Sequence, residues 1–394
     1  MSEKTINKIP NVPNLRFENY SNSYIKNKLG VVVFLRKGKY NPLKEKQDFP
    51  CIELESIEQD SCRMLEIFKA KNQKSIKTKF FKGDVLFGKL RPYLRKFLFS
   101  NFNGVCSTEI WALHSSAMLN SYLFYYLQTE YFMKIASTSS GTKMPRAEWS
   151  LVSNADIKYP DSIEEMTKIS TMLGLIDKRI ESQNKIIEDL IIKKKIISDK
   201  LFSQIPMHRN TLSSFYEKGR AGGTPKSTNK KYYAGEIPFL SISDMTEQGK
   251  YIYWTQKTLT QEGLENSTAW IVPKDSLVLS MYASVGQVAI NKIPLTTSQA
   301  IFSMTITDKV ILDFLYYYLS YFKEKKLHRY LETGTQSNIN ADFIKGIAIP
   351  DYGYYKNKLI ISLLSLMDEK IKKEKDILSL YKKQKSYLLQ NMFI

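Results

Sequence analysis

The sequence predicts an α+β protein in which two mixed α/β domains are separated by two long helices. The two helices are expected to form an intramolecular antiparallel coiled coil, which makes the chain a pseudo-two-fold tandem repeat. Three observations predict this: an internal repeat, a heptad pattern in each copy, and short β-rich runs ahead of each heptad pattern. At 394 residues, the chain is also long enough for two or more domains.

The repeat is visible in short matching segments at an offset of 191 positions, from Asp177 to Asp368. LIDKRI at 175–180 matches LMDEKI at 366–371, and GDVLFGKLRPYLRKF matches KDSLVLSMYASVGQV. GVCSTEIWAL aligns with LTTSQAIFSM, while YLFYYLQ meets FLYYYLS one residue out of step. Because the period far exceeds the roughly 20–50 residues of solenoid repeats, each copy is a domain with an appendage.

The domain part of each copy is predicted over residues 1–160 and 205–350. Short runs such as VVVFL, FPCIEL, AWIVP and SLVLSMY favour strands, and Gly, Pro and Asn interrupt them. The tyrosine-rich segments YLFYYLQ and FLYYYLS have a helical setting. Core packing is therefore favoured for them over a platform that stacks nucleic-acid bases.

The appendage of each copy is a long helix, predicted over residues 161–204 and 351–394. Its seam positions step by four and three, the spacing typical of a helix that packs along its length on another. Polar residues interrupt the seam at the same places in both copies. The first seam contains Ile169, Leu173, Ile176, Ile180, Gln183, Ile187, Leu190, Lys194, Ile197 and Leu201, and the second contains Ile360, Leu364, Met367, Ile371, Glu374, Leu378, Tyr381, Lys385, Leu388 and Met392.

The polar seam residues favour an antiparallel pairing of the two helices. A parallel pairing would set Lys194 against Lys385, two like charges in a seam. The predicted antiparallel register pairs Gln183 with Lys385, Lys194 with Glu374, and Ile180 with Leu388. Such a rod of roughly 48 Å would hold two heads apart, as in dimers that read DNA half-sites separated by about 34–36 Å.

Composition points to a polyanionic partner. The chain has 58 Lys and Arg against 39 Asp and Glu, with a pI near 9.4. Nucleic acid is the first candidate, and a role in solubility alone is the alternative. We expect a cytoplasmic protein, because there is no signal-peptide pattern or apolar run of about 18 residues. Three cysteines without C-x-x-C spacing and three scattered histidines predict neither a disulfide framework nor a metal site.

Taken together, these segments resemble the specificity (S) subunit of Type I restriction-modification systems over nearly the whole chain. The resemblance is carried by GDVLFGKLRPYLRK, by GGTPKSTNKKYYAGEIPFLSISDM from Gly222, and by the helical tails ending ISDKLF and LLQNMF. One departure is that YYAGEIPF has Tyr and Phe where such segments often carry tryptophan, which concerns the details of the second head.

The resemblance implies two target-recognition domains, each of which reads one half of an asymmetric, interrupted site in double-stranded DNA. It also implies that the helices bind two methyltransferase (M) subunits that modify adenine, and that two restriction (R) subunits can join. S-adenosylmethionine, ATP and magnesium are then expected only on the partner subunits. The alternative is a coiled-coil scaffold or oligomerisation protein without sequence-specific DNA recognition, and an enzyme with an unrecognised site ranks third.

The chain has no recognisable catalytic motif. GDVLFGKL is one residue short of a phosphate-binding loop, since Leu90 stands where Ser or Thr would hold magnesium. A turn or strand is favoured instead, with Lys89, Arg91, Arg95 and Lys96 facing a DNA backbone. The Asp/Asn-Pro-Pro-Tyr/Phe motif that grips a flipped adenine is absent, because no two prolines are adjacent. Methyl transfer must therefore come from a partner.

Further DNA contacts are predicted where basic and amide residues gather in loops. The stretch 69–82 has six lysines and no acid, so it suits phosphates, although a solvated loop would look the same. Arg and Lys suit guanine edges, and Gln and Asn suit adenine edges, but the same residues also serve as turn and capping residues. GGTPK is expected to make a tight turn through its glycines. The candidate residues in these loops are Lys143 and Arg146 after one Gly-Thr turn, Gln336 and Asn338 after the other, Lys226, and Tyr282.

Overall fold

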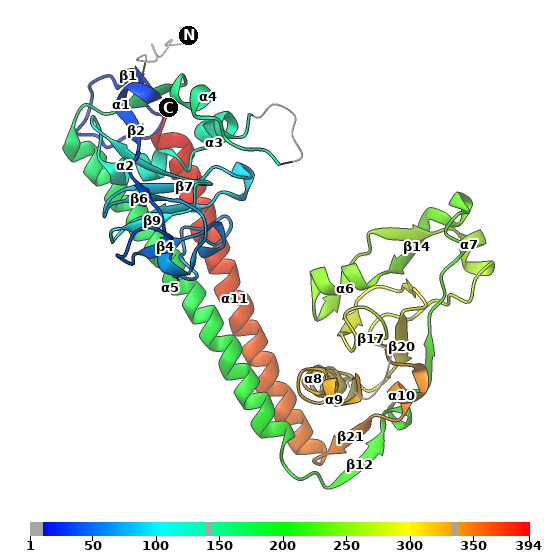
Figure 1. Ribbon diagram of the computed structural model, residues 1–394. Coiled ribbons are helices and arrows are strands. Elements are labelled where there is room, and N and C mark those ends of the chain that lie inside the picture. The colour runs from blue at the N-terminus through cyan, green and yellow to red at the C-terminus, as the bar shows by residue number, and fades with distance from the viewer. Residues whose placement is uncertain (1–10, 139–143, 332–337) are drawn as a thin grey trace. The chain divides into compact units, whose positions relative to one another are not determined.

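The computed structural model describes residues 11–138, 144–331 and 338–394, and its ribbon is shown in Figure 1. Its contacts divide the chain into two compact units. The first unit combines Met1–Ile186 with Glu374–Ile394, and the second is Ile187–Lys373. Each unit therefore contains one mixed domain, which we call a head, together with part of both long helices.

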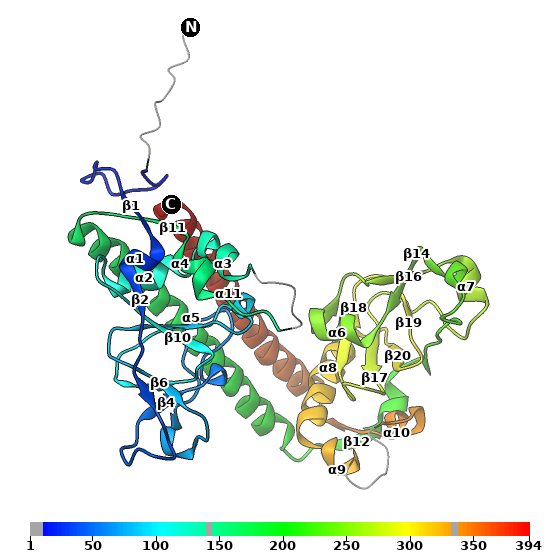
Figure 2. The same cartoon turned by 45° about the horizontal axis from the view of Figure 1, so that its top comes forward.

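The long helices are α5 (Ile163–Phe202) and α11 (Tyr354–Met392), which fall inside the two predicted helical segments. Both views show α5 and α11 side by side (Figures 1 and 2). In the first unit, the C-terminal end of α11 shares an apolar cluster with the start of α5. In the second unit, the start of α11 shares a cluster with the end of α5. The predicted antiparallel coiled coil is confirmed.

The predicted register of this coiled coil is wrong. Gln183 Nε2 donates to Glu374 Oε2 at 2.5 Å, not to a group on Lys385. Lys385 instead contacts Asp177 at 2.6 Å. Lys194 contacts Asp368 at 2.5 Å rather than Glu374. Both lysines meet a partner six positions earlier in the chain than predicted, a shift of about one heptad.

The shift has a physical reason. A sequence with an apolar layer every seven residues packs almost as well after a slip of one heptad, so polar matching must choose the register. The long lysine stem lets its ammonium leave the seam and reach a carboxylate beside it. Asp177 and Asp368 are such carboxylates, each directly after a seam residue. Ile371 and Glu374 remain buried, as seam residues should.

Disulfide trapping tests this register. We expect cysteines at positions 173 and 388 to oxidise readily, because both side chains are buried in one cluster of the first unit. A pair at 180 and 388, which the sequence-based register favours, should oxidise far more slowly, since one heptad displaces the partners by about 10 Å. Both variants carry Cys62→Ser, so that the partly exposed native thiol does not compete. Faster oxidation of the 180/388 pair would contradict the register.

Over its described residues, 11–138 and 144–159, the first head contains three sheets and four short α-helices, which are labelled in Figures 1 and 2. One sheet has five strands, one has four, and a two-stranded ribbon joins the start of the head to its end. In sheet order, these are β3 (Lys39–Tyr40), β6 (Lys77–Phe80), β9 (Gly104–Cys106), β4 (Pro50–Ile52) and β5 (Phe68–Lys69); β2 (Val33–Leu35), β10 (Ile110–Ser115), β7 (Val85–Gly88) and β8 (Phe97–Phe99); and β1 (Ile25–Lys28) with β11 (Asp156–Tyr159). The helices are α1 (Leu29–Val32), α2 (Asn120–Tyr126), α3 (Glu130–Ala136) and α4 (Trp149–Ser153).

The second head has the same organisation. Its sheets are β13 (Lys218–Ala221), β20 (Ile301–Thr305), β17 (Leu277–Ser280), β18 (Val288–Asn291) and β15 (Tyr251–Ile252); β16 (Lys257–Leu259), β14 (Tyr233–Leu240) and β19 (Thr296–Thr297); and β12 (His208–Thr211) with β21 (Ala348–Asp351). Its helices are α6 (Ile242–Gln248), α7 (Gln261–Glu265), α8 (Lys309–Lys325), α9 (His328–Leu331) and α10 (Ala341–Lys345).

The strand orders confirm the tandem repeat. The order β2-β10-β7-β8 recurs as β13-β20-β17-β18, with β15 added at one edge. The ribbon β1-β11 recurs as β12-β21, and the parallel pair β4/β9 recurs as β14/β19. The two heads differ most in the remaining sheet, which has five strands in the first head and three in the second.

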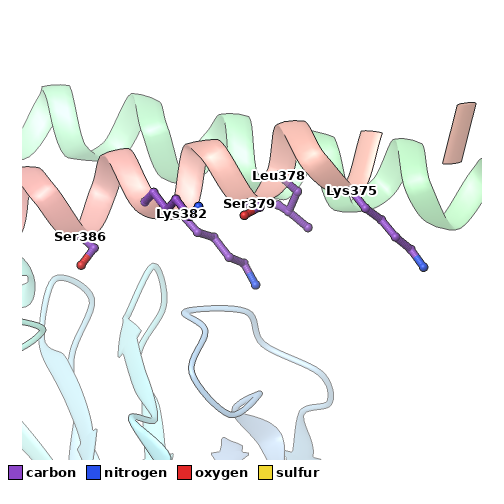
Figure 3. Close-up of a pocket in the computed structure, with 6 residues that line it drawn as sticks. Lys375, Leu378, Ser379, Lys382 and Ser386 are labelled. Carbon is purple, nitrogen blue, oxygen red and sulfur yellow. The ribbon is translucent and has the colours of Figure 1, made fainter. Parts of the chain in front are cut away.

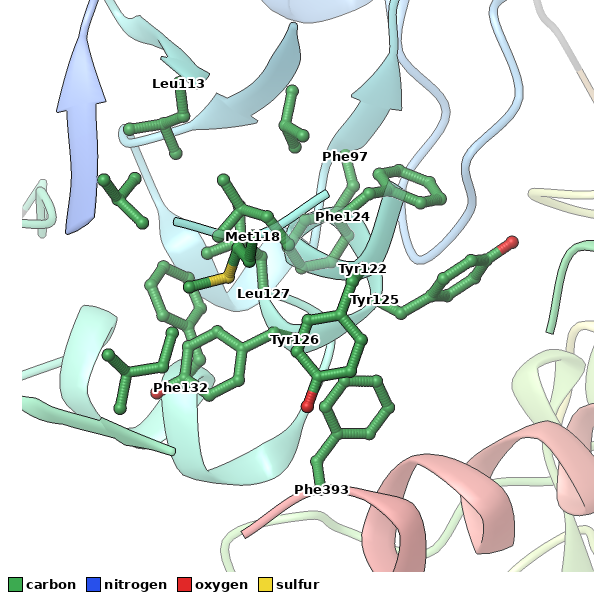
Figure 4. Packing of buried hydrophobic residues seen from close by; sticks show 14 of the residues in the cluster. Phe97, Leu113, Met118, Tyr122, Phe124, Tyr125, Tyr126, Leu127, Phe132 and Phe393 are labelled. Carbon is green, nitrogen blue, oxygen red and sulfur yellow. The ribbon is translucent and has the colours of Figure 1, made fainter. Parts of the chain in front are cut away.

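The tyrosine-rich helices lie in the core, as expected. Tyr122 and Tyr126 on α2 are buried in the main cluster of the first unit (Figure 4), and Tyr318 on α8 is buried in that of the second. The C-terminal Phe393 enters the first cluster, where its ring centroid lies 4.9 Å from that of Tyr122. Its repeat counterpart Phe202 packs on Tyr318 in the second. Each helical tail is thus anchored in a head by a phenylalanine.

Candidate nucleic-acid interface

In the first head, two segments that are far apart in the sequence meet at the end of β7. Leu90 and Arg146 form an isolated antiparallel bridge. The Arg91 amide donates to the Pro145 carbonyl, and the Ala147 amide donates to the Lys89 carbonyl, both at 2.8 Å. We call residues 88–91 with 144–147 the first turn pair. It brings Lys89 and Arg91 together with Arg146, which the sequence placed in a separate motif.

The two arginine side chains of the first turn pair are accessible, and that of Arg146 is held in one direction. Arg91 is exposed, and its φ of 51° places it in the left-handed region directly before Pro92. Arg146 keeps 48% of its side chain exposed while its Nε donates to Glu109 Oε2 at 3.0 Å. Glu109 therefore fixes the direction of a guanidinium whose remaining N–H groups stay available. Sequence analysis missed Glu109, because Ala300 stands at the corresponding place in the second copy.

Arg95 and Lys96 were predicted to face a DNA backbone, but in the structure both side chains bond to the head. Arg95 donates to the Gln128 carbonyl at 2.7 Å and forms ion pairs with Glu130 and Asp60. Lys96 Nζ donates to the Leu54 carbonyl at 2.6 Å, and burial lowers the pKa of its ammonium. The one-turn 3₁₀ helix at 92–94 lies between two left-handed residues, so the chain reverses and turns both cations back onto the head.

The lysine-rich stretch 69–82 is only partly available. Lys77 is buried and contacts Glu53 at 2.5 Å, and Lys79 contacts Glu45 at 3.0 Å. The stretch also supplies strands β5 and β6 rather than one open loop. Four lysines stay exposed for phosphate contact: Lys69, Lys71, Lys74 and Lys82.

The second head repeats the arrangement with other side chains. The Ile339 amide donates to the Met281 carbonyl at 3.1 Å, which joins the segment after β17 to the segment before α10. We call residues 281–287 with 338–340 the second turn pair. Tyr282 is 43% exposed and Asn338 is exposed as well. Lys143, Gln336 and both Gly-Thr turns lie outside the described residues.

The GGTPK segment differs from the expected tight turn. A Cβ at Gly222 would lie 2.0 Å from the Thr297 carbonyl oxygen, and one at Gly223 would lie 2.3 Å from the Ala269 amide nitrogen. The glycines are therefore required by close backbone approach and not by a left-handed conformation. Lys226 follows as an exposed residue, which leaves it free to reach a phosphate.

A shallow hollow runs along the surface of α11 in the first unit (Figure 3). It has a volume of about 480 Å³ and is lined by Lys375, Leu378, Ser379, Lys382, Lys383 and Ser386. Small-molecule sites enclose most of their ligand, whereas this hollow is open and has three lysines. An extended anion such as a phosphate backbone suits it better. Within 11–138, 144–331 and 338–394, no cluster of three or more potential metal ligands occurs.

Comparison with known proteins assigns the chain to a protein family. The model of the Type I restriction modification DNA specificity domain matches residues 26–190 and again 208–380. The chain belongs to this family. The two matches correspond to the two copies of the repeat, and each includes one turn pair. Among the described residues, no helix is long and apolar enough to cross a membrane.

Named relatives agree with the assignment. The Type I restriction enzyme MjaIX specificity subunit of Methanocaldococcus jannaschii is 30% identical over 179 residues, 44% of this chain and 40% of that protein. The HindI specificity subunit of Haemophilus influenzae is 24% identical over 344 residues, 66% of this chain and 74% of that protein. The alignment to the first relative thus spans less than half of its length.

Solved structures show the same fold. The S subunit of a Type I restriction-modification system from M. genitalium matches with a TM-score of 0.58 at 16% identity, over 97% of this chain and 99% of that chain. A chain from a type I R-M system, solved to explain complex assembly and conformational transition, matches with a TM-score of 0.61 at 16% identity, over 93% and 96%. Both likenesses extend over nearly the whole of each chain.

Proposed function

We propose that this chain is the specificity subunit of a Type I restriction-modification complex, which reads a bipartite, asymmetric site in double-stranded DNA. One observation carries the proposal: the first and second turn pairs have the same backbone arrangement but present different side chains. The first presents Arg91 and Arg146, and the second presents Tyr282 and Asn338, on the same topological frame. Two domains of the same fold that present different side chains suit two half-sites of different sequence.

The chemistry of the exposed groups agrees with direct readout. Arginine can donate twice to the O6 and N7 atoms of guanine, and asparagine can pair with adenine, in the major groove. The exposed lysines of the stretch 69–82 and of the α11 hollow would contact phosphates, which positions the protein without selecting a sequence. The formal charge of +19 provides the long-range attraction.

The long helices are proposed to dock two methyltransferase subunits, and restriction subunits can join that complex. Support comes from exposed apolar residues that recur at the repeat spacing. A helix that only faced water would not need them, so they indicate a surface that a partner covers. These pairs are Leu175 with Leu366, Ile186 with Ile377, and Ile196 with Tyr387. A surface that occurs twice suits two copies of one partner. S-adenosylmethionine, ATP and magnesium would then be held by the partners.

A binding selection tests the proposal. The chain, assembled with its methyltransferase subunit, is offered random-sequence duplexes at rising salt. Nonspecific binding depends steeply on salt, so a sequence reader should retain a small set of duplexes that share two short motifs at fixed separation. A coiled-coil scaffold without DNA specificity would lose all duplexes together, and that result would refute the proposal.

A further inference from the structure

The same cluster of three side chains occurs once in each unit. In the first, Asp177 Oδ1 accepts from Lys385 Nζ at 2.6 Å, and Asp177 Oδ2 accepts from the Tyr125 hydroxyl at 2.9 Å. In the second, Asp368 Oδ1 accepts from Lys194 Nζ at 2.5 Å, and Asp368 Oδ2 accepts from the Tyr317 hydroxyl at 2.9 Å. We call these the first and second clamps.

Each clamp joins three separate elements at one carboxylate. In the first, the tyrosine comes from the head helix α2, the aspartate from α5 and the lysine from α11. In the second, the tyrosine comes from α8, and the two long helices exchange roles, with the aspartate on α11 and the lysine on α5. The clamps account for the recurrence of LIDKRI as LMDEKI. They also agree with the one-residue slip that sets YLFYYLQ against FLYYYLS, because Tyr125 and Tyr317 occupy corresponding places in that alignment.

The geometry of a clamp is directional. The two carboxylate oxygens point the bonds to the head and to the opposite helix in fixed directions, which apolar packing does not do. The lysine ammonium also lies over the tyrosine ring, 5.7 Å from the centroid in the first clamp and 5.5 Å in the second. In the second clamp, the Tyr317 hydroxyl accepts a further bond from Lys250 at 3.0 Å. Polar contacts that involve a seam residue, as each clamp lysine is, are most useful for fixing orientation.

We propose that the two clamps are positioning devices: each holds its head at a set orientation on the long helices, and together they set the half-site spacing that the protein accepts. The proposal rests on the proposed function. One base pair more or less moves a half-site by about 3.4 Å and turns it by roughly 35°. A head that can shift and turn on its helices by about this much would therefore admit a neighbouring spacing.

The test removes one hydroxyl at a time. Tyr125→Phe and Tyr317→Phe keep the ring and the Asp–Lys pair and lose the bond between head and helix. Tyr317→Phe also loses the bond that its hydroxyl accepts from Lys250 within the same head, so Tyr125→Phe is the cleaner of the two variants. The matched controls are the adjacent Tyr126→Phe and Tyr318→Phe, whose hydroxyls donate to the carbonyls of Asp156 and Ala348 inside their own heads. All four variants, in complex with the methyltransferase subunit, are compared with the parent chain on duplexes whose spacer is native, one base pair shorter or one longer.

We expect Tyr125→Phe and Tyr317→Phe to reduce discrimination between spacers by roughly tenfold, the effect of one hydrogen bond to a charged group. Their preference for bases within each half-site should not change. The control variants should keep the spacer preference of the parent chain even where their melting temperatures fall equally. Unchanged spacer discrimination in both clamp variants would overturn the proposal and reduce the clamps to a purely structural role.

A measurement without DNA keeps this result separate from the proposed function. Spin labels carried by unnatural amino acids at exposed Lys71 and Lys383, both in the first unit, report the distance between head and helix. The distance distribution should broaden in Tyr125→Phe and stay narrow in Tyr126→Phe. If the parent chain selects no bipartite site, the proposed function fails, and the width of this distribution alone decides whether the clamp orients the head. Equal widths in the two variants would show that it does not.

Discussion

Phe393→Ala is expected to lower the free energy of unfolding of the first unit by about 3–5 kcal/mol, the usual cost of emptying a buried phenylalanine site. Phe393 is 6% exposed and lies against Tyr122 in the cluster that joins α11 to the first head (Figure 4). Loss of its ring removes the anchor of the α11 tail. Denaturant titration of the variant against the parent chain measures the effect.

The matched control for this variant is Tyr387→Ala, an aromatic truncation in the last turns of the same helix, where the side chain is 58% exposed. It should cost no more than about 0.5 kcal/mol, as surface substitutions usually do. Phe202→Ala, the repeat counterpart, should cost as much as Phe393→Ala, but in the second unit. Equal losses for Phe393→Ala and Tyr387→Ala would show that the tail is not anchored as described.

Arg91→Gln and Arg146→Gln are each expected to weaken specific DNA binding by about 1–3 kcal/mol and to relax base preference in one half-site only. Both guanidinium groups belong to the first turn pair and reach solvent there. The half-site read by the second head should keep its sequence. Binding selections with the variants and the parent chain at one salt concentration provide the measurement.

The control for charge loss is Arg95→Gln. It removes the same charge from the same segment, but its guanidinium is bonded to Gln128, Glu130 and Asp60 on the head. We expect this variant to lose thermal stability and to keep the base preference of the parent chain. If Arg91→Gln altered both half-sites, or if Arg95→Gln altered base preference as strongly, the assignment of the first turn pair would be wrong.

The fold was predictable because the sequence contains an internal repeat, so each copy supports the interpretation of the other. A run such as SLVLSMY could be a strand or a buried helix by itself, but its match to VLFGKLR at the repeat offset ties the two copies to one architecture. Seam positions that step by four and three identified the long helices. The like charges of Lys194 and Lys385 excluded a parallel pairing, and the structure is antiparallel.

The register and the clamps were not predictable from the same pattern. Apolar layers repeat every heptad, so neighbouring registers bury similar surface, and only the reach of each lysine separates them. Lys385 bonds to Asp177, which lies outside the seam, and Tyr125 reaches the same carboxylate from a helix in the head. Contacts of this kind depend on tertiary packing that no local spacing expresses.

The sequence predicted which kinds of residue would contact DNA, but not which individual residues are accessible. Lys89, Arg91, Arg95 and Lys96 look alike in the sequence. A turn with two left-handed residues exposes Arg91 and folds Arg95 back onto the head. Glu109, which orients Arg146, has Ala300 as its counterpart in the second copy, so the repeat does not reveal it. Backbone conformation therefore separated the accessible cations from the structural ones.

Methylome sequencing of cells that express this chain with its methyltransferase subunit tests the central claim most directly. If one chain mounts two unlike DNA readers on its paired helices, modified adenines should occur in a single interrupted motif with two different halves at one fixed separation, one modified adenine in each half. Arg91→Gln should then change one half alone. A continuous motif, or two halves that vary independently in spacing, would contradict the account.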